Sequence, residues 1–189
     1  MHISVSGSFS TGKTTLVTAA RDRLVAEPRI DVVAIEEVAR GVIARGYRLD
    51  KEATLDSYLN YILAQLSAER ASRVHNHVIS DRSLIDLLAY VRVNKDPKVP
   101  NDLNSLLEEI VWLEAQYFDI YCYIPVEFPP QNDGIRSTDI NYQLEVDREL
   151  VKLFREYKIS TVRISGAKEA RLEAFVSLFT GSLVGRSGT

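Results

Sequence analysis

The chain has little of several residues that mark particular protein classes. Its 189 residues include one cysteine, Cys122, so no intramolecular disulfide can form and we expect the reducing environment of a cytoplasm. No apolar run approaches the roughly 20 residues that cross a bilayer, and a strand is predicted almost at the N-terminus, so we expect neither a membrane span nor a signal peptide. The three histidines show no metal-ligand spacing with the cysteine.

The chain also has little net charge. Its 23 Lys and Arg residues and 26 Asp and Glu residues give a formal charge of -3. A nucleic-acid-binding domain usually presents a net basic surface, so this balance disfavours action on a nucleic acid. That alternative stays open only if a local basic groove forms. The residues that could form it are Arg40, Arg45, Arg48 and Arg82.

The most informative segment is the glycine-rich run at residues 7–14. It matches G-x-x-x-x-G-K-T, the loop whose backbone N–H groups cradle nucleotide phosphates in P-loop NTPases. Lys13 would place a cation on the β- and γ-phosphates, and Thr14 would offer a hydroxyl to Mg²⁺. The predicted nucleotide-binding residues are Gly7, Ser8, Phe9, Ser10, Thr11, Gly12, Lys13, Thr14 and Thr15.

The context of this run favours a phosphate loop over a glycine- and serine-rich turn that binds nothing. A short β-rich run, Ile3–Ser6, precedes it. Leu16, Ala20 and Leu24 follow at helical spacing, and Pro28 sets the end of that helix. Strand, loop and helix in this order are what the motif requires.

Strand and helix patterns alternate along the rest of the chain. Further strands are predicted at residues 32–35, 78–80, 120–124 and 159–164, and further helices at 55–66, 84–93, 103–117, 146–157 and 170–179. Short apolar strands that alternate with helices indicate a doubly wound α/β fold with a parallel sheet covered on both faces. We expect one domain over residues 1–183, a lid-like loop at about residues 127–141 and a flexible tail at 184–189.

The helix predicted at residues 55–66 has one apolar stripe. Its members step by four, three and four residues, which is the spacing of an amphipathic helix. We therefore expect this stripe to be the buried face of the helix. The residues of the stripe are Leu55, Leu59, Ile62 and Leu66.

In a doubly wound fold, ligands bind beyond the carboxyl ends of the strands. The second strand is followed by Glu36 and Glu37, either of which could orient or deprotonate an acceptor hydroxyl. Glu37 is the preferred residue and Glu36 the alternative, although both would also suit the first turn of a helix. Arg40 could hold an anionic or polar group of the substrate.

Asp81 and Arg82 follow the third strand. Asp81 is a candidate Mg²⁺ ligand together with Thr14, or a substrate ligand, or simply a helix cap. Arg82 would face the same cleft. Gln65, on a predicted helix, could read a base edge, or be an exposed helical glutamine.

Two more segments follow the fourth and fifth strands. Arg136, in the predicted lid, could reach the γ-phosphate, or be a solvated residue after an Asp-Gly turn. The small residues Ser165, Gly166 and Ala167 could let a nucleotide base lie flat on the backbone, or form a simple loop.

These motifs together resemble the P-loop nucleoside and nucleotide kinases, and within that group the AAA_28 family, which includes the kinase domain of NadR, a ribosylnicotinamide kinase. The motifs that carry the resemblance are residues 7–15, Glu37-Val38-Ala39-Arg40, Asp81-Arg82-Ser83 and Asp133-Gly134-Ile135-Arg136. They span about three-quarters of the chain in the expected order. The doubled Glu36-Glu37 departs from the pattern and leaves the choice of base open.

The resemblance implies a three-layer P-loop fold with sheet order 2-3-1-4-5. It also implies transfer of the ATP γ-phosphate, with Mg²⁺, to a hydroxyl of a small nucleoside- or nucleotide-like acceptor. Lys13, Glu37, Asp81 and Arg136 would be catalytic. The substrate-binding set would be Glu36, Glu37, Arg40, Gln65 and Arg82.

Two other functions stay open beside this ATP-dependent phosphotransferase. One is a nucleotide-dependent NTPase or switch protein without a small acceptor, and the other is the kinase acting on a nucleic acid. The preference for ATP over GTP comes from the resemblance alone. Neither the identity of the acceptor nor the oligomeric state follows from the sequence.

Overall fold

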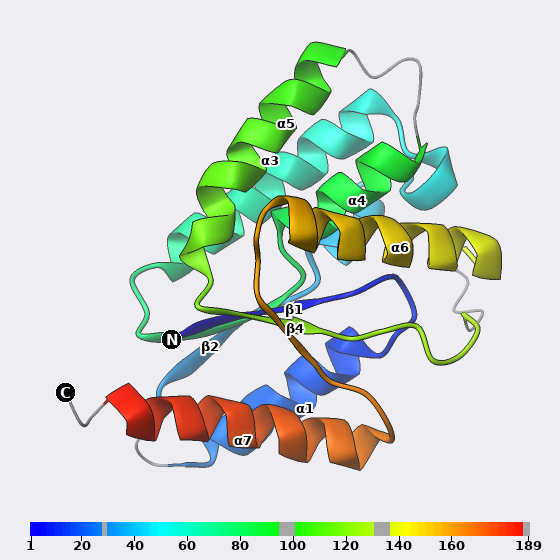
Figure 1. Cartoon of the computed structure of the whole chain (residues 1–189). Coiled ribbons are helices and arrows are strands. Elements are labelled where there is room, and N and C mark those ends of the chain that lie inside the picture. The colour runs from blue at the N-terminus through cyan, green and yellow to red at the C-terminus, as the bar shows by residue number, and fades with distance from the viewer. Residues whose placement is uncertain (28–29, 95–100, 131–136, 187–189) are drawn as a thin grey trace.

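In the computed structural model, one parallel sheet lies between two layers of helices (Figure 1). The structure describes residues 1–27, 30–94, 101–130 and 137–186. The strand order β2-β3-β1-β4-β5 confirms the predicted five-stranded α/β fold and its order. The strands are β1 His2–Ser6, β2 Val32–Ile35, β3 His77–Asp81, β4 Ile120–Tyr123 and β5 Thr161–Arg163.

Helices cover both faces of the sheet. α1 and α7 lie side by side on one face, while α3, α4, α5 and α6 lie on the other (Figure 1). The helices are α1 Lys13–Val25, α2 Val38–Ala44, α3 Leu55–Ser72, α4 Leu84–Asn94, α5 Asn101–Glu114, α6 Ile140–Glu156 and α7 Lys168–Arg186, with single 3₁₀ turns at η1 Asp50–Glu52 and η2 Ala115–Tyr117. Within the described ranges, no helix has the length and apolarity needed to cross a bilayer.

The apolar strands separate two cores. Ile3 and Val5 of β1 are fully buried and pack with Phe175 and Phe179 of α7 on one side. Cys122 of β4 is fully buried in the same core, as predicted, and burial raises the pKa of its thiol to about 12. The central strands are therefore rigid supports, and their carboxyl ends hold the loops that follow in fixed positions.

The buried face of α3 differs from the predicted stripe. Ile62 is buried as expected, but Leu59 is 36% exposed and Leu55 and Leu66 are only partly buried. The face turned toward the protein carries tyrosines and polar groups instead, because α3 packs against α2 and against the start of α4. Leucine spacing cannot reveal such a face. Its buried residues include Tyr58, Tyr61, Gln65 and Glu69.

Helix α2 was not predicted from the sequence. It spans only Val38–Ala44, and a pattern of seven residues is too short for helical spacing to stand out. The helix begins directly after Glu37, which is its N-cap residue. It therefore fixes where the carboxylate of Glu37 and the guanidinium of Arg40 lie.

Candidate active site

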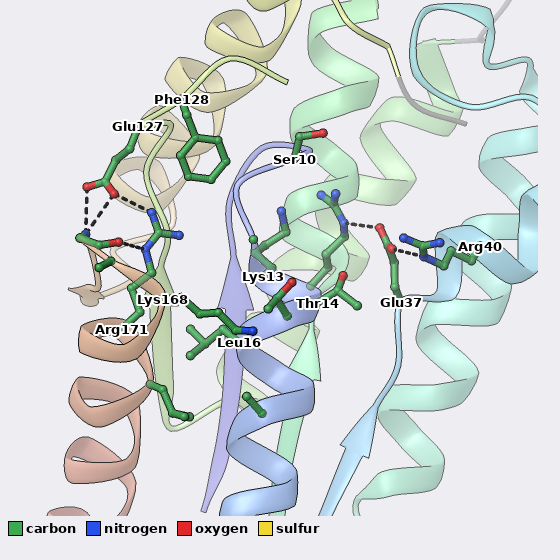
Figure 2. A pocket seen from close by; sticks show the side chains of 17 residues that line it. Ser10, Lys13, Thr14, Leu16, Glu37, Arg40, Glu127, Phe128, Lys168 and Arg171 are labelled. Atoms are coloured by element: carbon green, nitrogen blue, oxygen red, sulfur yellow. Dashed lines mark hydrogen bonds and ion pairs between the residues drawn. The ribbon is translucent and has the colours of Figure 1, made fainter. Parts of the chain in front are cut away.

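A cavity of about 600 Å³ lies at the carboxyl ends of the strands (Figure 2). Its floor is the phosphate loop, from Ser10 to Thr15, except that the side chain of Thr11 is buried behind it. One end is bounded by Glu37, Arg40 and Arg82, and the other by residues that follow β4 and β5. The segments that follow all five strands therefore contribute residues to this one cavity, as expected at the carboxyl ends of a parallel sheet.

The two glycines of the loop are required by its backbone. Gly7 has φ +157°, and a Cβ there would lie 2.4 Å from the carbonyl oxygen of Ile124. Gly12 has φ +88° at the N-cap of α1, in the left-handed region where side chains are strained. The loop can therefore turn from β1 into α1 within a few residues.

The loop is anchored to two helices that follow much later in the chain, α6 and α7. Ser8 donates its hydroxyl to the carbonyl of Gln143 on α6 at 2.9 Å, and the Gln143 amide donates to the carbonyl of Phe9 at 2.7 Å. Arg171 of α7 donates to the carbonyl of Thr11 at 2.6 Å. The side chains of Ser8, Phe9 and Thr11 are buried by these contacts, so they support the loop from behind.

Lys13 and Thr14 face the cavity at the start of α1. The Lys13 ammonium donates to the carbonyl of Ser8 and, at 3.2 Å, to the hydroxyl of Thr11. Thr14 is exposed and lines a second cavity of about 610 Å³ as well as the first. Both residues therefore line the cavity beside the phosphate loop.

Glu36 and Glu37 lie in very different surroundings. The side chain of Glu37 is 5% exposed; one carboxylate oxygen accepts from Nε of Arg40 at 3.0 Å, and the other lies 3.6 Å from Nε of Arg82 (Figure 2). The side chain of Glu36 is 84% exposed and lies 3.6 Å from Arg21. Glu37 lines both cavities, whereas Glu36 lines the second cavity but not the first.

Arg82 is buried and held in a strained conformation. Its φ is +80°, a value that costs a residue with a side chain about 1–3 kcal/mol. One terminal nitrogen donates to the carbonyl of Gly7 at 3.2 Å and to the hydroxyl of Tyr90 at 3.3 Å. Burial alone would lower the pKa of Arg82, but the surrounding phenols and the carboxylates of Asp86 and Asp81 raise it overall. A strained, buried cation beside the phosphate loop indicates a functional group.

Asp81 lies on the wall of the second cavity, which Thr14 and Glu37 also line. It is 1% exposed, and neither of its carboxylate oxygens has a hydrogen-bond partner among the described residues. A buried carboxylate normally has its hydrogen bonds satisfied, so two unsatisfied oxygens fit a bound cation. In the described part of the chain, no cluster of three or more His, Cys, Asp or Glu residues could hold a metal by itself.

The structure places the other predicted residues as follows. Gln65 is fully buried behind Arg82: its amide donates to Glu69 at 2.9 Å and to the carbonyl of Arg82 at 3.5 Å, and it lines neither cavity. Gln65 is therefore not an exposed helical glutamine. It could affect a substrate only indirectly, by its hydrogen bond to Arg82. Arg136 and the rest of Asp133-Gly134-Ile135-Arg136 lie outside the described residues.

The four arginines considered for a nucleic-acid groove are not all exposed, and two of the exposed ones are paired with carboxylates. Arg82 is buried, Arg40 pairs with Glu37, and Arg48 pairs with Glu52 at 2.6 Å. Arg45 lines the second cavity and, unlike Arg40 and Arg48, has no carboxylate partner among the described residues. This arrangement gives no continuous basic track of the kind that follows a phosphate backbone.

Residues 2–171 match the family model AAA_28, described as an AAA domain. The chain belongs to the AAA_28 family. No protein with curated annotation matches it by sequence. The resemblance inferred from the motifs is thereby confirmed at the level of the family.

Solved structures share the fold of this AAA_28 protein. A NadR protein in complex with NR has a TM-score of 0.73 at 24% identity, over 95% of this chain and 51% of that chain. Deoxyadenosine kinase from M. mycoides has a TM-score of 0.65 at 13% identity, over 98% and 100% of the two chains. Thymidylate kinase from Candida albicans has 0.64 at 13% identity, over 96% and 91%. The chain spans about half the length of the NadR protein.

Several residues of the AAA_28 site were not predicted from the sequence. Arg171 donates to the carbonyl of Gly166 at 2.7 Å and to the carboxylate of Glu127 at 2.6 Å, and these three residues close the far end of the cavity beside Phe128 (Figure 2). The hydrogen bonds from the Gly166 N–H and from Arg171 lower the pKa of Glu127. Neither Arg171 nor Glu127 belongs to a motif, so no signal in one sequence would have identified them.

Proposed function

We propose that this protein is a kinase that transfers the γ-phosphate of a nucleoside triphosphate, with ATP preferred, to a hydroxyl of a small nucleoside- or nucleotide-like acceptor. One observation carries the proposal. The phosphate loop with Lys13 shares a single cavity with the carboxylate of Glu37, which is flanked by two arginines. A donor phosphate bound at the loop and an acceptor hydroxyl bound at Glu37 would therefore lie in the same cavity, with no protein segment between them.

The donor nucleotide would lie along the whole cavity. Its phosphates would rest on the N–H groups at the start of α1, where the helix dipole favours negative charge. Lys13 would exchange its contacts with Ser8 and Thr11 for the β- and γ-phosphates. The base would lie at the other end, against Gly166 and Ala167, with the ring of Phe128 nearby.

Mg²⁺ suits the residues that are present. Thr14 and Asp81 would hold it, because a hydroxyl and an unsatisfied buried carboxylate line the same cavity. Mg²⁺ held by these residues would offset the negative charge that develops on the transferred phosphoryl group. The protein supplies few ligands of its own, as is usual when phosphates and water complete the shell.

The acceptor would approach from the side of Glu37, Arg40 and Arg82. Glu37 would accept the hydrogen bond of the attacking hydroxyl and take its proton as the oxygen bonds to the γ-phosphorus and the bond to the β–γ bridging oxygen breaks. Arg40, which is half exposed, would contact a polar group of the acceptor. Because the transition state is loose, positioning by these groups would supply most of the acceleration.

Neighbouring structures support this assignment of substrate class. One is a kinase of a deoxynucleoside, one is a kinase of a nucleotide, and the NadR structure contains NR. A tyrosine-lined cavity of about 20 Å³, bounded by Tyr58, Tyr61 and Tyr90, lies next to Arg82. It would have to widen by side-chain movement before it could admit an aromatic ring of the acceptor.

The deciding experiment is ATP consumption with Mg²⁺ against a panel of nucleosides, nucleoside monophosphates and ribosylnicotinamide. We expect a rate that depends on one class of acceptor and is lost in Lys13→Ala. A rate independent of every acceptor would refute the kinase and support an NTPase or switch protein. Phosphate transferred to an oligonucleotide end, with steep salt dependence, would instead support the kinase acting on a nucleic acid.

A further inference from the structure

The two peptide units that flank Gly7 are held by one short segment at the start of α4. The Gly7 N–H donates to Oδ1 of Asp86 at 2.9 Å, and the Gly7 carbonyl accepts from Arg82 at 3.2 Å. The N–H of Arg82 in turn donates to the carbonyl of Val5 at 3.0 Å. These three hydrogen bonds bind the end of β1, where the phosphate loop begins, to residues 82–86.

Asp86 itself has its hydrogen bonds satisfied, although it is only 1% exposed. Besides the Gly7 N–H, it accepts from the hydroxyl of Ser6 at 2.8 Å, and from the N–H and hydroxyl of Ser83 at 3.1 and 3.4 Å. A buried carboxylate is costly unless donors surround it, and these contacts supply four. The two ends of this network are the phosphate loop and the turn that carries Asp81 and Arg82.

Part of this network is an ordinary helix cap. In a capping box, the third helical residue accepts from the N–H of the N-cap residue, as Asp86 does from Ser83. A helix cap of this kind needs only one oxygen of the carboxylate. The second oxygen of Asp86 accepts a hydrogen bond from the N–H of Gly7, which is 79 residues away in the sequence.

We propose that Asp86 is a positioning residue for the phosphate loop: it draws the Gly7 N–H into the protein and, with Arg82, fixes the loop relative to the acceptor side. A carboxylate is required because it presents acceptors to both Gly7 and Ser83 at once. An amide has one acceptor oxygen, so it must leave one of these buried N–H groups unsatisfied or opposed to its own NH₂. The proposal rests on nucleotide binding by the loop, as in the proposed function.

The test is the affinity of Asp86→Asn for Mg·ATP, measured by isothermal titration calorimetry well below its unfolding temperature. We expect the dissociation constant to rise at least tenfold. The matched control is Glu114→Gln, another buried carboxylate, which binds Arg70 and Arg73 far from the phosphate loop along the chain. Both variants should unfold at lower urea concentration, but only Asp86→Asn should bind Mg·ATP more weakly.

The outcomes separate this proposal from the proposed function. If Asp86→Asn is destabilised like Glu114→Gln but binds Mg·ATP as the wild type does, Asp86 is a helix cap and nothing more. If the wild-type protein binds neither Mg·ATP nor Mg·GTP, the proposed function fails and this proposal fails with it. Loss of binding in Asp86→Asn alone, with normal binding in the wild type, supports both.

A second measurement uses the wild-type protein, in case Asp86→Asn does not fold. A buried N–H bonded to a carboxylate exchanges its proton slowly with solvent, whereas an N–H that faces a cavity exchanges quickly. We expect the Gly7 amide to exchange as slowly as those of the central strands, with and without Mg·ATP. Fast exchange in either state would overturn the proposal.

Discussion

The donor half and the acceptor half of the cavity are held together in different ways. In the donor half, Ser8, Thr11 and Gly7 make hydrogen bonds to α4, α6 and α7, and the loop backbone is fixed on several sides. In the acceptor half, Arg82 has an Nε without a hydrogen bond, and in the adjoining second cavity Asp81 has two unsatisfied carboxylate oxygens, among the described residues. The phosphate loop is therefore fixed by contacts within the protein, although Oε1 of Gln143 behind it has no hydrogen-bond partner among the described residues. Arg82 and Asp81 have polar atoms that a ligand would satisfy.

This difference matches the demands of phosphoryl transfer. Every nucleoside triphosphate presents the same phosphates, so the groups that bind them can be fixed in advance. An acceptor varies between enzymes, so its binding groups come from several elements and cost stability until they are used. Substitutions in the two halves should therefore have different signatures.

Lys13→Ala should have the largest effect. Removing the cation that the motif places on the β- and γ-phosphates should lower the rate of transfer about a thousandfold or more. The protein should stay folded, because the hydrogen bonds of Ser8 to α6 and of Thr11 to α7 anchor the loop and do not involve the Lys13 ammonium. Acceptor-dependent ATP consumption and circular dichroism would measure the two quantities. A rate near that of the wild type would remove the phosphate-loop assignment.

The next largest effect should come from Glu37→Gln. The amide cannot take the proton of the acceptor hydroxyl, so we expect turnover to fall about a hundredfold while the dissociation constant of Mg·ATP changes less than threefold. Glu36→Gln is the matched control, because Glu36 is the adjacent residue and its side chain is 84% exposed. Equal losses in the two variants, or equal losses of turnover and ATP affinity in Glu37→Gln, would return Glu37 to a structural role.

The same contrast explains what the sequence could predict. Residues 7–15 are contiguous, so their chemistry is visible in the chain, and the alternation of apolar strands with helices gave the sheet. Glu37, Asp81 and Arg82 could be found because strand ends converge. Gln143, Arg171 and Glu127 reach the site through the tertiary fold alone, so no local pattern marks them. Asp86 had a local signal, the Ser-x-x-Asp capping box, but that signal indicates only a helix start.

Asp81→Asn should have two moderate effects: it should weaken the use of Mg²⁺ in catalysis, and it should stabilise the protein in EDTA. If Asp81 holds Mg²⁺ with Thr14, the Mg²⁺ concentration for half-maximal activity should rise about tenfold. In EDTA, the variant should instead be more stable than the wild type, by about 1–3 kcal/mol, because the substitution removes a buried carboxylate with no partner.

The control for this prediction is Asp86→Asn. Asp86 is equally buried, but its oxygens are satisfied, so the same chemical change should destabilise the protein in EDTA. Urea unfolding of both variants, with and without Mg·ATP, makes the comparison. If both variants lose stability equally in EDTA, Asp81 has a protein partner in solution and the metal assignment fails.

The last prediction concerns Glu69, which supports the acceptor half from behind and does not line the cavity itself. Burial raises its pKa to about 8, and the hydrogen bonds from Gln65 and from the N–H of Leu84 only partly oppose this. Between its ordinary value of 4.5 and about 8, Glu69 therefore binds a proton in the folded protein but not in the unfolded chain. The contribution of Glu69 to the free energy of unfolding is complete below pH 4.5 and is lost as the pH rises through about 8. The free energy of unfolding falls by at most about 1.4 kcal/mol per pH unit in this range.

Glu69→Gln should remove most of this pH dependence, because the amide resembles the protonated acid and cannot ionise. Urea midpoints across this pH range would show a falling free energy of unfolding in the wild type and a flatter profile in the variant. Glu173→Gln, at an exposed position on α7, should keep the slope of the wild type. Parallel profiles for wild type and Glu69→Gln would mean that Glu69 finds a charged or solvent partner in solution. In that case the acceptor half would be less tightly packed behind Arg82 than Gln65 and Glu69 indicate.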